Sequence, residues 1–458
     1  SSPLLSQLLI NGNWAGVQGG QSGGLFCSDL SNPTLNDVVI SGNTSNGYGG
    51  GIYIYNSSPI FNNVMIEDNI AIKGGGIYLE HDSNPQFTDV IVRSNGADLF
   101  GGGIFIDDNS SVIFQSTTID SNYSSNRGGG VYCYNSNLNG TNVIVSHNST
   151  SDPTGSGGGL YLSASDVELT QSEIRNNSST SNGGGLRINS SNIMMAEVTI
   201  SENYSSSNGG GMYLSRGTTN LNFVSVTKNF AVNQGGGINN NNMTYLNLTN
   251  VNICDNNSAY AGGVFASGIE TISNTIIANN IGGGLYESGQ GISVNYSNFW
   301  NNSIYNMGDW VGLNVMTNAN GDSCDYYHNI MLDPSFIDPT IGDYRLNVNS
   351  PAIDAGDPNS DIDPDGSISD MGAFYFNTVL YTPFSDFSAD PQLGNPPFEV
   401  NFTDLSQLSA NGTPIESWLW DFGDDNNSSE QNPLHTFQDN GLYTVSLTII
   451  DTLGFSDK

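Results

Sequence analysis

Clusters of glycine recur along the first two thirds of this chain at a nearly constant interval. The ends of successive clusters are mostly 26 or 27 residues apart, from Gly24 to Gly284. A second mark, an apolar residue followed by any two residues and then asparagine, keeps the same interval from Asn13 to Asn302. A repeat of this length predicts a solenoid, in which each repeat forms one coil and buries its apolar face by stacking on its neighbours.

The segments between the two marks have the alternation of short β-strands. Each glycine cluster is followed by an apolar triplet such as Ile52-Tyr53-Ile54, whose first and third side chains point to one face. In the run 59–69, Phe61, Val64 and Ile66 are the expected inward residues. No helical period is apparent. We therefore predict an all-β chain whose residues 1–310 form a right-handed parallel β-helix of about 11 to 12 coils.

The recurring asparagines and glycines are best explained as architecture. Like residues of adjacent coils stack about 4.8 Å apart, so each asparagine amide reaches the next one and a ladder forms. Asparagine also tolerates the left-handed backbone of a sharp corner, and glycine allows positive φ and close backbone approach. The predicted ladder residues are Asn43, Asn69, Asn95, Asn122, Asn148, Asn177, Asn203 and Asn229.

The middle residue of each triplet is usually aromatic and is expected to point outward. Stacked rings on the outside of a rod would form a platform for sugar rings or for a partner protein. The rings are also compatible with a purely structural role, because aromatic residues favour strands and stack on each other, or because a loop from each coil covers them. The candidate ligand-binding residues are Tyr53, Tyr78, Phe105, Tyr132 and Tyr161.

Composition excludes several classes of partner. With 9 Lys and Arg against 44 Asp and Glu, the formal net charge is −35, which argues against binding to nucleic acid or to an anionic membrane. No apolar run is long enough to span a bilayer, so no membrane insertion is expected. Cys27 and Cys133 share one repeat position four coils apart, roughly 19 Å, which is too far for a disulfide, so both are expected to be buried hydrophobes.

The alternation of GGG(I/L/V/M) with (I/V/F)xxN over about residues 1–305 resembles the repeats of chlamydial polymorphic outer membrane proteins, which carry GGA(I/L/V) and FxxN. This chain differs in the third glycine and in frequent Ile or Val in place of Phe. The resemblance implies a surface adhesin. The chain begins inside a repeat, so we expect either preceding coils or a partner over that edge.

Beyond the repeats, residues 311–376 are rich in Pro, Asp and Gly and are expected to cap the β-helix. Within them, D-I-D-P-D-G-S-I-S-D follows the D-x-D-x-D-G pattern of calcium loops, although residue 372 is glycine where an EF-hand has glutamate. A solvated acidic turn is the alternative. The expected Ca²⁺ ligands are Asp361, Asp363, Asp365 and Asp370.

A linker at 377–386 leads to a segment of different composition, residues 387–458. Its motifs FEVNFTDLS, SWLWDFGDD, NPLHTF and GLYTVSL resemble PKD domains, with Asp425 where glycine is usual. The resemblance implies an immunoglobulin-like β-sandwich that acts as a spacer or interaction module at cell surfaces. Alternating residues from Val400 to Ile449 fit its core. The pattern ends before the last strand, so we expect an incomplete domain.

Together these features predict an extracellular or cell-surface structural and adhesive rod without catalytic residues. Its expected partners are other surface proteins, copies of itself as in a filament, or extracellular glycans. The alternative is a polysaccharide-binding or polysaccharide-degrading protein, since many parallel β-helices cleave acidic polysaccharides. The basic residues are few and scattered, and the four histidines form no motif.

Overall fold

The computed structural model describes all residues except 1, 17–21, 242–243, 289–290 and 304–315. The chain divides into two compact units, one of Ser1–Ser360 with Ser369–Tyr375 and one of Asp361–Ile368 with Phe376–Lys458. Its described helices are two 3-10 turns, η1 (Pro339–Ile341) and η2 (Thr378–Leu380), which confirms an all-β chain. Neither turn has the length or apolarity to cross a membrane. The expected end of the coils near residue 310 lies outside the described residues.

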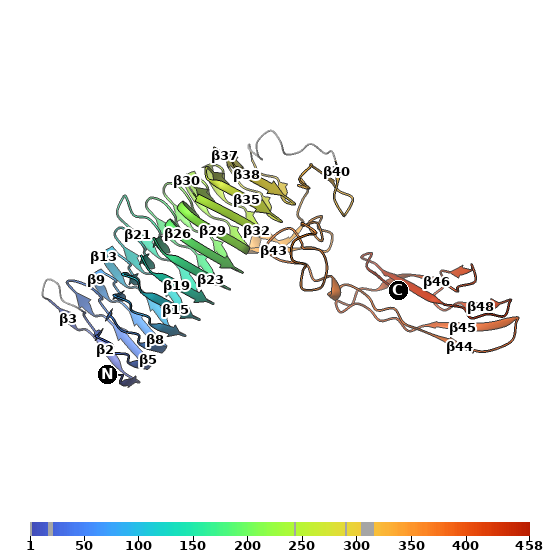
Figure 1. The fold of residues 1–458 in the computed structure, drawn as a ribbon, viewed down its shortest axis with the longest axis horizontal. Helices are drawn as coiled ribbons and strands as arrows, with labels where there is room; N and C mark the ends of the chain where they lie inside the picture. The colour runs from blue at the N-terminus through green and yellow to red at the C-terminus, as the bar shows by residue number, and fades with distance from the viewer. Residues whose placement is uncertain (1, 17–21, 242–243, 289–290, 304–315) are drawn as a thin grey trace. The chain divides into compact units, whose positions relative to one another are not determined.

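The first unit contains a β-solenoid of about 11 turns, as predicted (Figure 1). Its coils stack as parallel strands in a 29-stranded sheet and a 10-stranded sheet. One row of strands follows the glycine clusters: β4 (Leu25–Ser28), β7 (Ile52–Tyr55), β10 (Ile77–Glu80), β14 (Ile104–Ile106), β18 (Val131–Tyr134), β22 (Leu160–Ser163), β31 (Ile238–Asn240), β34 (Val264–Ala266) and β37 (Leu285–Glu287).

Two further rows belong to the same sheet, and several long strands run through more than one row. The second row comprises β1 (Leu4–Ser6), β5 (Thr34–Ser41), β8 (Ile60–Glu67), β11 (Gln86–Thr88), β15 (Ser111–Gln115), β19 (Asn137–Thr141), β23 (Asp166–Thr170), β26 (Leu186–Ala196), β29 (Met212–Thr227), β32 (Thr244–Cys254), β35 (Ile269–Ser273) and β38 (Ile292–Asn295). The third adds β2 (Leu9–Asn11), β12 (Ile91–Arg93), β16 (Thr118–Asp120), β20 (Ile144–Ser146), β24 (Glu173–Arg175), β27 (Thr199–Ser201), β36 (Ile276–Ala278) and β39 (Asn298–Trp300).

The 10-stranded sheet begins directly after the asparagine ladder. Its strands are short because each coil turns back toward the next glycine cluster within a few residues. They are β3 (Trp14–Ala15), β6 (Thr44–Ser45), β9 (Ile70–Lys73), β13 (Gly96–Phe100), β17 (Tyr123–Ser124), β21 (Ser149–Thr150), β25 (Ser178–Ser179), β28 (Tyr204–Ser205), β30 (Phe230–Gln234) and β33 (Asn257–Tyr260).

The core of the β-helix consists of the inward aliphatic and aromatic side chains. Ile52, Ile54, Phe61, Val64 and Ile66 are all buried, which confirms the predicted alternation. Stacking from coil to coil places like residues together, so the rings of Phe61 and Phe87 lie 4.6 Å apart with nearly parallel planes. All four cysteines are free and buried, as expected for Cys27 and Cys133.

The asparagine ladder explains why the two repeat marks keep one period. The Nδ2 of Asn95 donates to Oδ1 of Asn122 at 3.0 Å and to the carbonyl of Ile66 at 2.9 Å, and its backbone N–H donates to the same Oδ1. A Cβ added to Gly103 would lie 3.0 Å from Cγ of Asn122 and 2.7 Å from the carbonyl oxygen of Gly130. The third glycine of each cluster therefore leaves room for the ladder.

The left-handed residues differ from expectation. The ladder asparagines have ordinary backbone angles, and the residue before each one carries the positive φ, as in Ser94 at 54° and Ser121 at 56°. Within each glycine cluster from Gly49 to Gly237 only the first residue is left-handed, as in Gly101 at 62°. The corner is therefore made one residue earlier than predicted, and the asparagine itself supplies the hydrogen bonds that hold it.

The segment after the coils packs in two places on the first unit. Residues near β41 (Ser323–Cys324) cover the last coil, where Phe299 N–H donates to the carbonyl of Ile330 at 3.0 Å. The hairpin of β42 (Phe336–Asp338) and β43 (Asp343–Leu346) lies instead beside β32, where the Tyr344 hydroxyl donates to Asp255 at 2.6 Å. The short strand β40 (Met316–Thr317) pairs with β41.

The second unit consists mainly of two antiparallel sheets, consistent with a PKD domain. One has β44 (Phe387–Asp390), β45 (Phe398–Asp404) and β48 (Leu434–Phe437), and the other has β46 (Ile415–Asp421), β47 (Asn427–Ser428), β49 (Ser446–Asp451) and β50 (Ser456–Asp457). Trp420 is fully buried between Phe387 and Phe402.

Candidate functional site

A hollow lies on the outer face of the 29-stranded sheet. It has a volume of about 530 Å³ and lies over five stacked strands, β15, β19, β23, β26 and β29. The strands run in register, so outward side chains from successive coils form straight rows across its floor. One row contains Ser111, Asn137, Asp166, Asn192 and Thr218, and the second contains Ile113, Asn139, Glu168, Met194 and Asn220.

The hollow combines hydrogen-bonding groups with exposed apolar surface. Asn192 Nδ2 donates to Oδ1 of Asp166 at 2.9 Å, which fixes both side chains. Met194 is 58% exposed, so its side chain offers apolar contact beside these polar groups. The two carboxylates, Asp166 and Glu168, are the charged groups among the lining residues, which include no Lys, Arg or His. The floor is therefore suited to a ligand with many hydroxyl groups and no negative charge.

Sequence reasoning missed this site because its residues occupy variable positions between the two repeat marks. The signal present in the sequence is the polar character of alternate residues, as in Asp166-Val167-Glu168, where valine points inward. Alternation alone identifies outward residues in every coil. It does not show where consecutive coils place Asn, Asp and Thr side by side, since that requires the register between strands.

The predicted exposed aromatic row is wrong in one respect, because the rings are buried. Tyr53, Tyr78, Phe105, Tyr132 and Tyr161 are 2–8% exposed and form a cluster of their own outside the main core. The residues just before each glycine cluster cover them. Tyr48 stacks on Tyr78 at 4.7 Å, and Phe100 stacks on Tyr132 at 5.3 Å. Coverage by a loop from each coil is thus confirmed, and these rings form no open platform.

Cations and a carboxylate complete this aromatic layer. Lys73 Nζ lies 5.3 Å from the ring centre of Phe105, and the Arg127 guanidinium lies 5.2 Å from that of Tyr161. The Tyr78 hydroxyl donates to Glu80 at 2.9 Å, and Tyr53 donates to the same carboxylate. Burial, then the neighbouring Glu80 charge and hydrogen bond, raise the pKa of Tyr78, so these hydroxyls stay protonated. The layer stiffens one side of the rod.

The predicted calcium ligands are divided between the two units. Asp361, Asp363 and Asp365 belong to the second unit and Asp370 to the first. Burial opposes the charged form of Asp365, but hydrogen bonds from Thr378 and Ser367 outweigh it and keep its pKa low. Within the described part of the chain, no group of three or more His, Cys, Asp or Glu is placed to hold a metal ion. Calcium binding stays a prediction.

One carboxylate lies inside the β-helix core. Glu270 is 1% exposed and accepts hydrogen bonds at Oε1 from Asn240 Nδ2 and from the Gly268 N–H, the latter at 2.9 Å. Burial raises its pKa, and the hydrogen bonds at Oε1 only partly oppose this. Oε2 lies among the buried side-chain atoms that have no hydrogen-bond partner. The charged form is therefore disfavoured in the folded state.

This burial predicts a pH-dependent stability. Because the folded state holds the Glu270 proton more tightly than the unfolded state, stability is greatest below the ordinary carboxyl pKa and falls as the pH rises to the raised value. Glu270→Gln should remove this loss and raise the Tm at pH 7 by about 2–4 °C. Thermal unfolding from pH 4 to 7 checks it, with exposed Glu168→Gln as the control; an unchanged slope in Glu270→Gln would contradict it.

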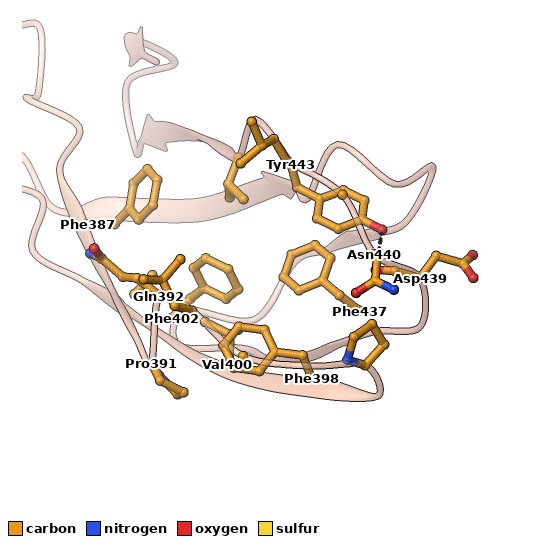
Figure 2. A pocket seen from close by; sticks show the side chains of 17 residues that line it. Phe387, Pro391, Gln392, Phe398, Val400, Phe402, Phe437, Asp439, Asn440 and Tyr443 are labelled. Carbon is orange, nitrogen blue, oxygen red and sulfur yellow. Dashed lines mark hydrogen bonds between the residues drawn. The ribbon is translucent and has the colours of Figure 1, made fainter.

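The second unit has a pocket of about 360 Å³, lined by the sheet of β44, β45 and β48 and by residues of the segments 391–396 and 439–445 (Figure 2). Figure 2 shows the rings of Phe398, Phe402, Phe437 and Tyr443 turned toward it. These residues also pack in the hydrophobic core of the same unit. The Tyr443 hydroxyl donates to the carbonyl of Asp439 at 2.9 Å. We interpret this space as the open end of the sandwich core, since its walls are the core side chains themselves.

Comparisons with known proteins agree with this architecture. Residues 75–244 match the model of the right-handed β-helix region, residues 37–55 match the Chlamydia polymorphic membrane protein repeat, and residues 383–458 match the PKD domain. Collagenase ColA of Bacillus cereus is 43% identical over 60 residues, which are 13% of this chain and 6% of that protein.

Among solved structures, pectate lyase Pel9A superposes with a TM-score of 0.33 at 14% identity, covering 82% of this chain and 97% of that one. This likeness is too weak to carry an inference about activity. The three matched models lie in separate segments, and each agrees with the structure of its own segment. The chain is therefore a right-handed β-helix with a repeat of the Chlamydia polymorphic membrane protein type, joined to a C-terminal PKD domain.

Proposed function

We propose that this chain is an extracellular or cell-surface adhesive rod whose hollow over β15 to β29 binds an uncharged glycan. The observation that carries the proposal is the pair of in-register rows of Asn, Asp, Ser and Thr side chains that form its floor. PKD domains are typical of extracellular proteins, which supports the location. The rod would hold this site away from its point of attachment.

The chemistry of the floor favours a glycan over other ligands. Amide and hydroxyl groups such as those of Asn137 and Thr218 donate and accept hydrogen bonds in the manner sugar hydroxyls require. Exposed Met194 offers apolar contact for the C–H faces of sugar rings, and exposed Ile113 lies in the same row beside the hollow. The Asp166 and Glu168 carboxylates, together with a net charge of −35, would repel a polyuronate. Other surface proteins and further copies of the chain are additional proposed partners of the rod.

A glycan array probed with the full chain tests the proposal. The double variant Asn137→Ala/Asn192→Ala should lose at least about tenfold in affinity, because several hydrogen bonds to the ligand are removed. The matched control is Asn36→Ala/Asn62→Ala, which also removes two asparagines and one 2.9 Å side-chain hydrogen bond from the same sheet, outside the hollow. Native chain that binds no glycan, or equal binding by both double variants, would overturn the proposal.

A hydrolytic activity is the second candidate, and the two carboxylates favour it. Asp166 and Glu168 are separated by one residue on β23 and point to the same face, with their backbones roughly 6.6 Å apart along the strand. The two carboxyl groups of an inverting glycosidase are about 6.5–9.5 Å apart, a spacing that side chains at two successive outward positions of one strand can reach. Release of reducing ends from uncharged polysaccharides, abolished in Asp166→Asn, would establish hydrolysis. Binding without release would support the adhesive function.

We also propose that the loop at Asp361, Asp363 and Asp365 binds Ca²⁺. The D-x-D-x-D-G spacing supports this, as does Gly366 with a φ of 90°, which makes the turn between the acidic residues and Ser367. Calcium at 100 times its Kd should stabilise the unit by about 2.7 kcal/mol. Thermal unfolding in EGTA and in added Ca²⁺ measures this, with Asp361→Asn expected to abolish the difference. Identical melting in both buffers would refute calcium binding.

A further inference from the structure

An exposed row of aromatic and small residues runs along the 10-stranded sheet, immediately after the asparagine ladder. The first residue of each strand points outward and pairs in register with the same position of the next coil, as in Trp14 with Thr44 and Tyr204 with Phe230. We call this the outer stripe. Its members are Trp14, Thr44, Ile70, Gly96, Tyr123, Ser149, Ser178, Tyr204, Phe230, Asn257 and Ile281.

The large members of the stripe are open to solvent. Trp14 is 71% exposed, Tyr123 is 48% exposed and Tyr204 is 44% exposed, unlike the covered rings beside the glycine clusters. The planes of Tyr204 and Phe230 are parallel within 1°, with ring centres 5.5 Å apart. With the exposed isoleucines of the same row, these rings make a strip of apolar surface on one sheet, and the largest apolar patch of a protein is often functional.

Two of the rings lie over glycines. A Cβ added to Gly96 would overlap the ring and hydroxyl of Tyr123, and one added to Gly16 would overlap the indole of Trp14. The missing side chains therefore provide the space that these rings occupy. Other coils carry Ile, Tyr or Phe at the position of Gly96, so glycine is not needed there for the backbone. This arrangement supplies aromatic faces that sugar rings can stack on.

The shape and charge of the stripe select its ligand. The stripe spans about 11 coils, a length of roughly 48 Å, and is about 7 Å wide. Its surface area is therefore roughly 300 Å². A stable dimer needs about 800 Å² from each partner, so a second copy of the chain fits poorly. None of the stripe residues is charged, although the chain carries a net charge of −35. A long, narrow, uncharged and partly aromatic surface is complementary to a single extended polymer of uncharged sugars.

We propose that the outer stripe binds a linear, uncharged polysaccharide along the rod, with sugar rings stacked on Trp14, Tyr123 and the Tyr204–Phe230 pair. This goes beyond the hollow, which lies on the other sheet and is lined by different residues. The stripe would let one rod make several weak contacts with one polymer chain, and such contacts strengthen each other when a single ligand spans them.

Binding of the full chain to cellulose, chitin, xylan and mannan, with polygalacturonate as the charged comparison, tests the stripe. Tyr204→Ser/Phe230→Ser should weaken binding to an uncharged polymer by at least about tenfold, since two stacking rings are lost. Serine already occupies this position in two other coils, at Ser149 and Ser178, so the fold should persist. Tyr134→Ser, which removes an exposed tyrosine from β18, is the matched control.

Gly96→Ala gives a second, independent variant. It keeps the Tyr123 ring but displaces it, so it should also weaken binding while leaving the melting temperature unchanged. The proposal fails if the native chain binds no uncharged polymer, if polygalacturonate binds more tightly, or if the stripe variants bind like Tyr134→Ser. It also fails if the stripe variants abolish a dimer in sedimentation, which would make the stripe a self-interface. If the hollow variant lost binding while the stripe variants kept it, the stripe would not be a binding site, and the proposed adhesive function would be unaffected.

Discussion

Replacing Gly102 with alanine is expected to lower the free energy of unfolding by more than about 2 kcal/mol. The added Cβ would overlap the carbonyl oxygens of Tyr123 and Gly129 in the next coil. Gly102 has no positive φ, so the cost is steric and not conformational. Both carbonyl oxygens are backbone atoms of a stacked coil. The overlap can therefore be removed only if the coils separate and the hydrogen bonds between them lengthen. Chemical denaturation of the full chain measures the loss.

Gly96→Ala is the matched control for this result. Gly96 lies in the same coil, but the three atoms nearest to a Cβ there all belong to the end of the Tyr123 side chain, which can move aside. We expect a change within about 0.5 kcal/mol, the range for substitutions away from the core. If Gly102→Ala lowered the free energy of unfolding as little as Gly96→Ala, the glycine clusters would not be required for close stacking of the coils. Their strict recurrence would then have to come from a functional role.

The second large effect is expected at the ladder. In Asn122→Ala the backbone N–H and one Nδ2–H of Asn95 lose their acceptor on residue 122, and the carbonyl of Val92 loses its amide donor. The Asn148 carboxamide oxygen keeps the backbone N–H of residue 122. At about 1–3 kcal/mol for each unsatisfied buried group, the free energy of unfolding should fall by at least about 3 kcal/mol. Hydrogen exchange should then show loss of protection centred on the coils of Asn95, Asn122 and Asn148.

Asn126→Ala provides the comparison within the same coil. The Asn126 amide donates to Thr154 Oγ1 at 3.2 Å in an exposed position, and water replaces that contact without cost. Its unfolding free energy should match that of the native chain. Equal stabilities of Asn122→Ala and Asn126→Ala would show that the ladder hydrogen bonds make no net contribution to the free energy of unfolding.

Much of the fold can be predicted from the sequence because stacked coils place equivalent residues in equivalent positions, so the same pattern recurs in every repeat. The interval between Gly103 and Gly130 gives the coil length, and alternation in Ile52-Tyr53-Ile54 separates core from surface. The alternation from Val400 to Ile449 likewise predicted core residues of the PKD domain, and both of these residues are buried. The backbone conformation at the corner was harder to predict, because Asn and the residue before it can both adopt the left-handed region. The structure shows that the preceding residue adopts it, while the asparagine side chain forms the hydrogen bonds of the ladder.

The surfaces could not be predicted in the same way. Tyr78 and Tyr123 both occupy outward positions of short strands, yet one is 3% exposed and the other 48%. The difference depends on loop residues such as Tyr48 that fold back over one sheet and leave the other open. The hollow likewise depends on which coils place polar residues side by side. Alternation identifies a side chain as outward but does not identify what covers it.

Glycan binding in the hollow is tested most directly by the affinity of a single uncharged oligosaccharide, chosen from the glycan array, for three forms of the full chain. Titration calorimetry would compare the native chain, Asn137→Ala/Asn192→Ala in the hollow, and Asn36→Ala/Asn62→Ala on the same sheet. At least about tenfold weaker binding is expected for the hollow variant alone, with all three forms melting at the same temperature. Equal affinities in the three forms, or no binding by the native chain, would contradict glycan binding in the hollow.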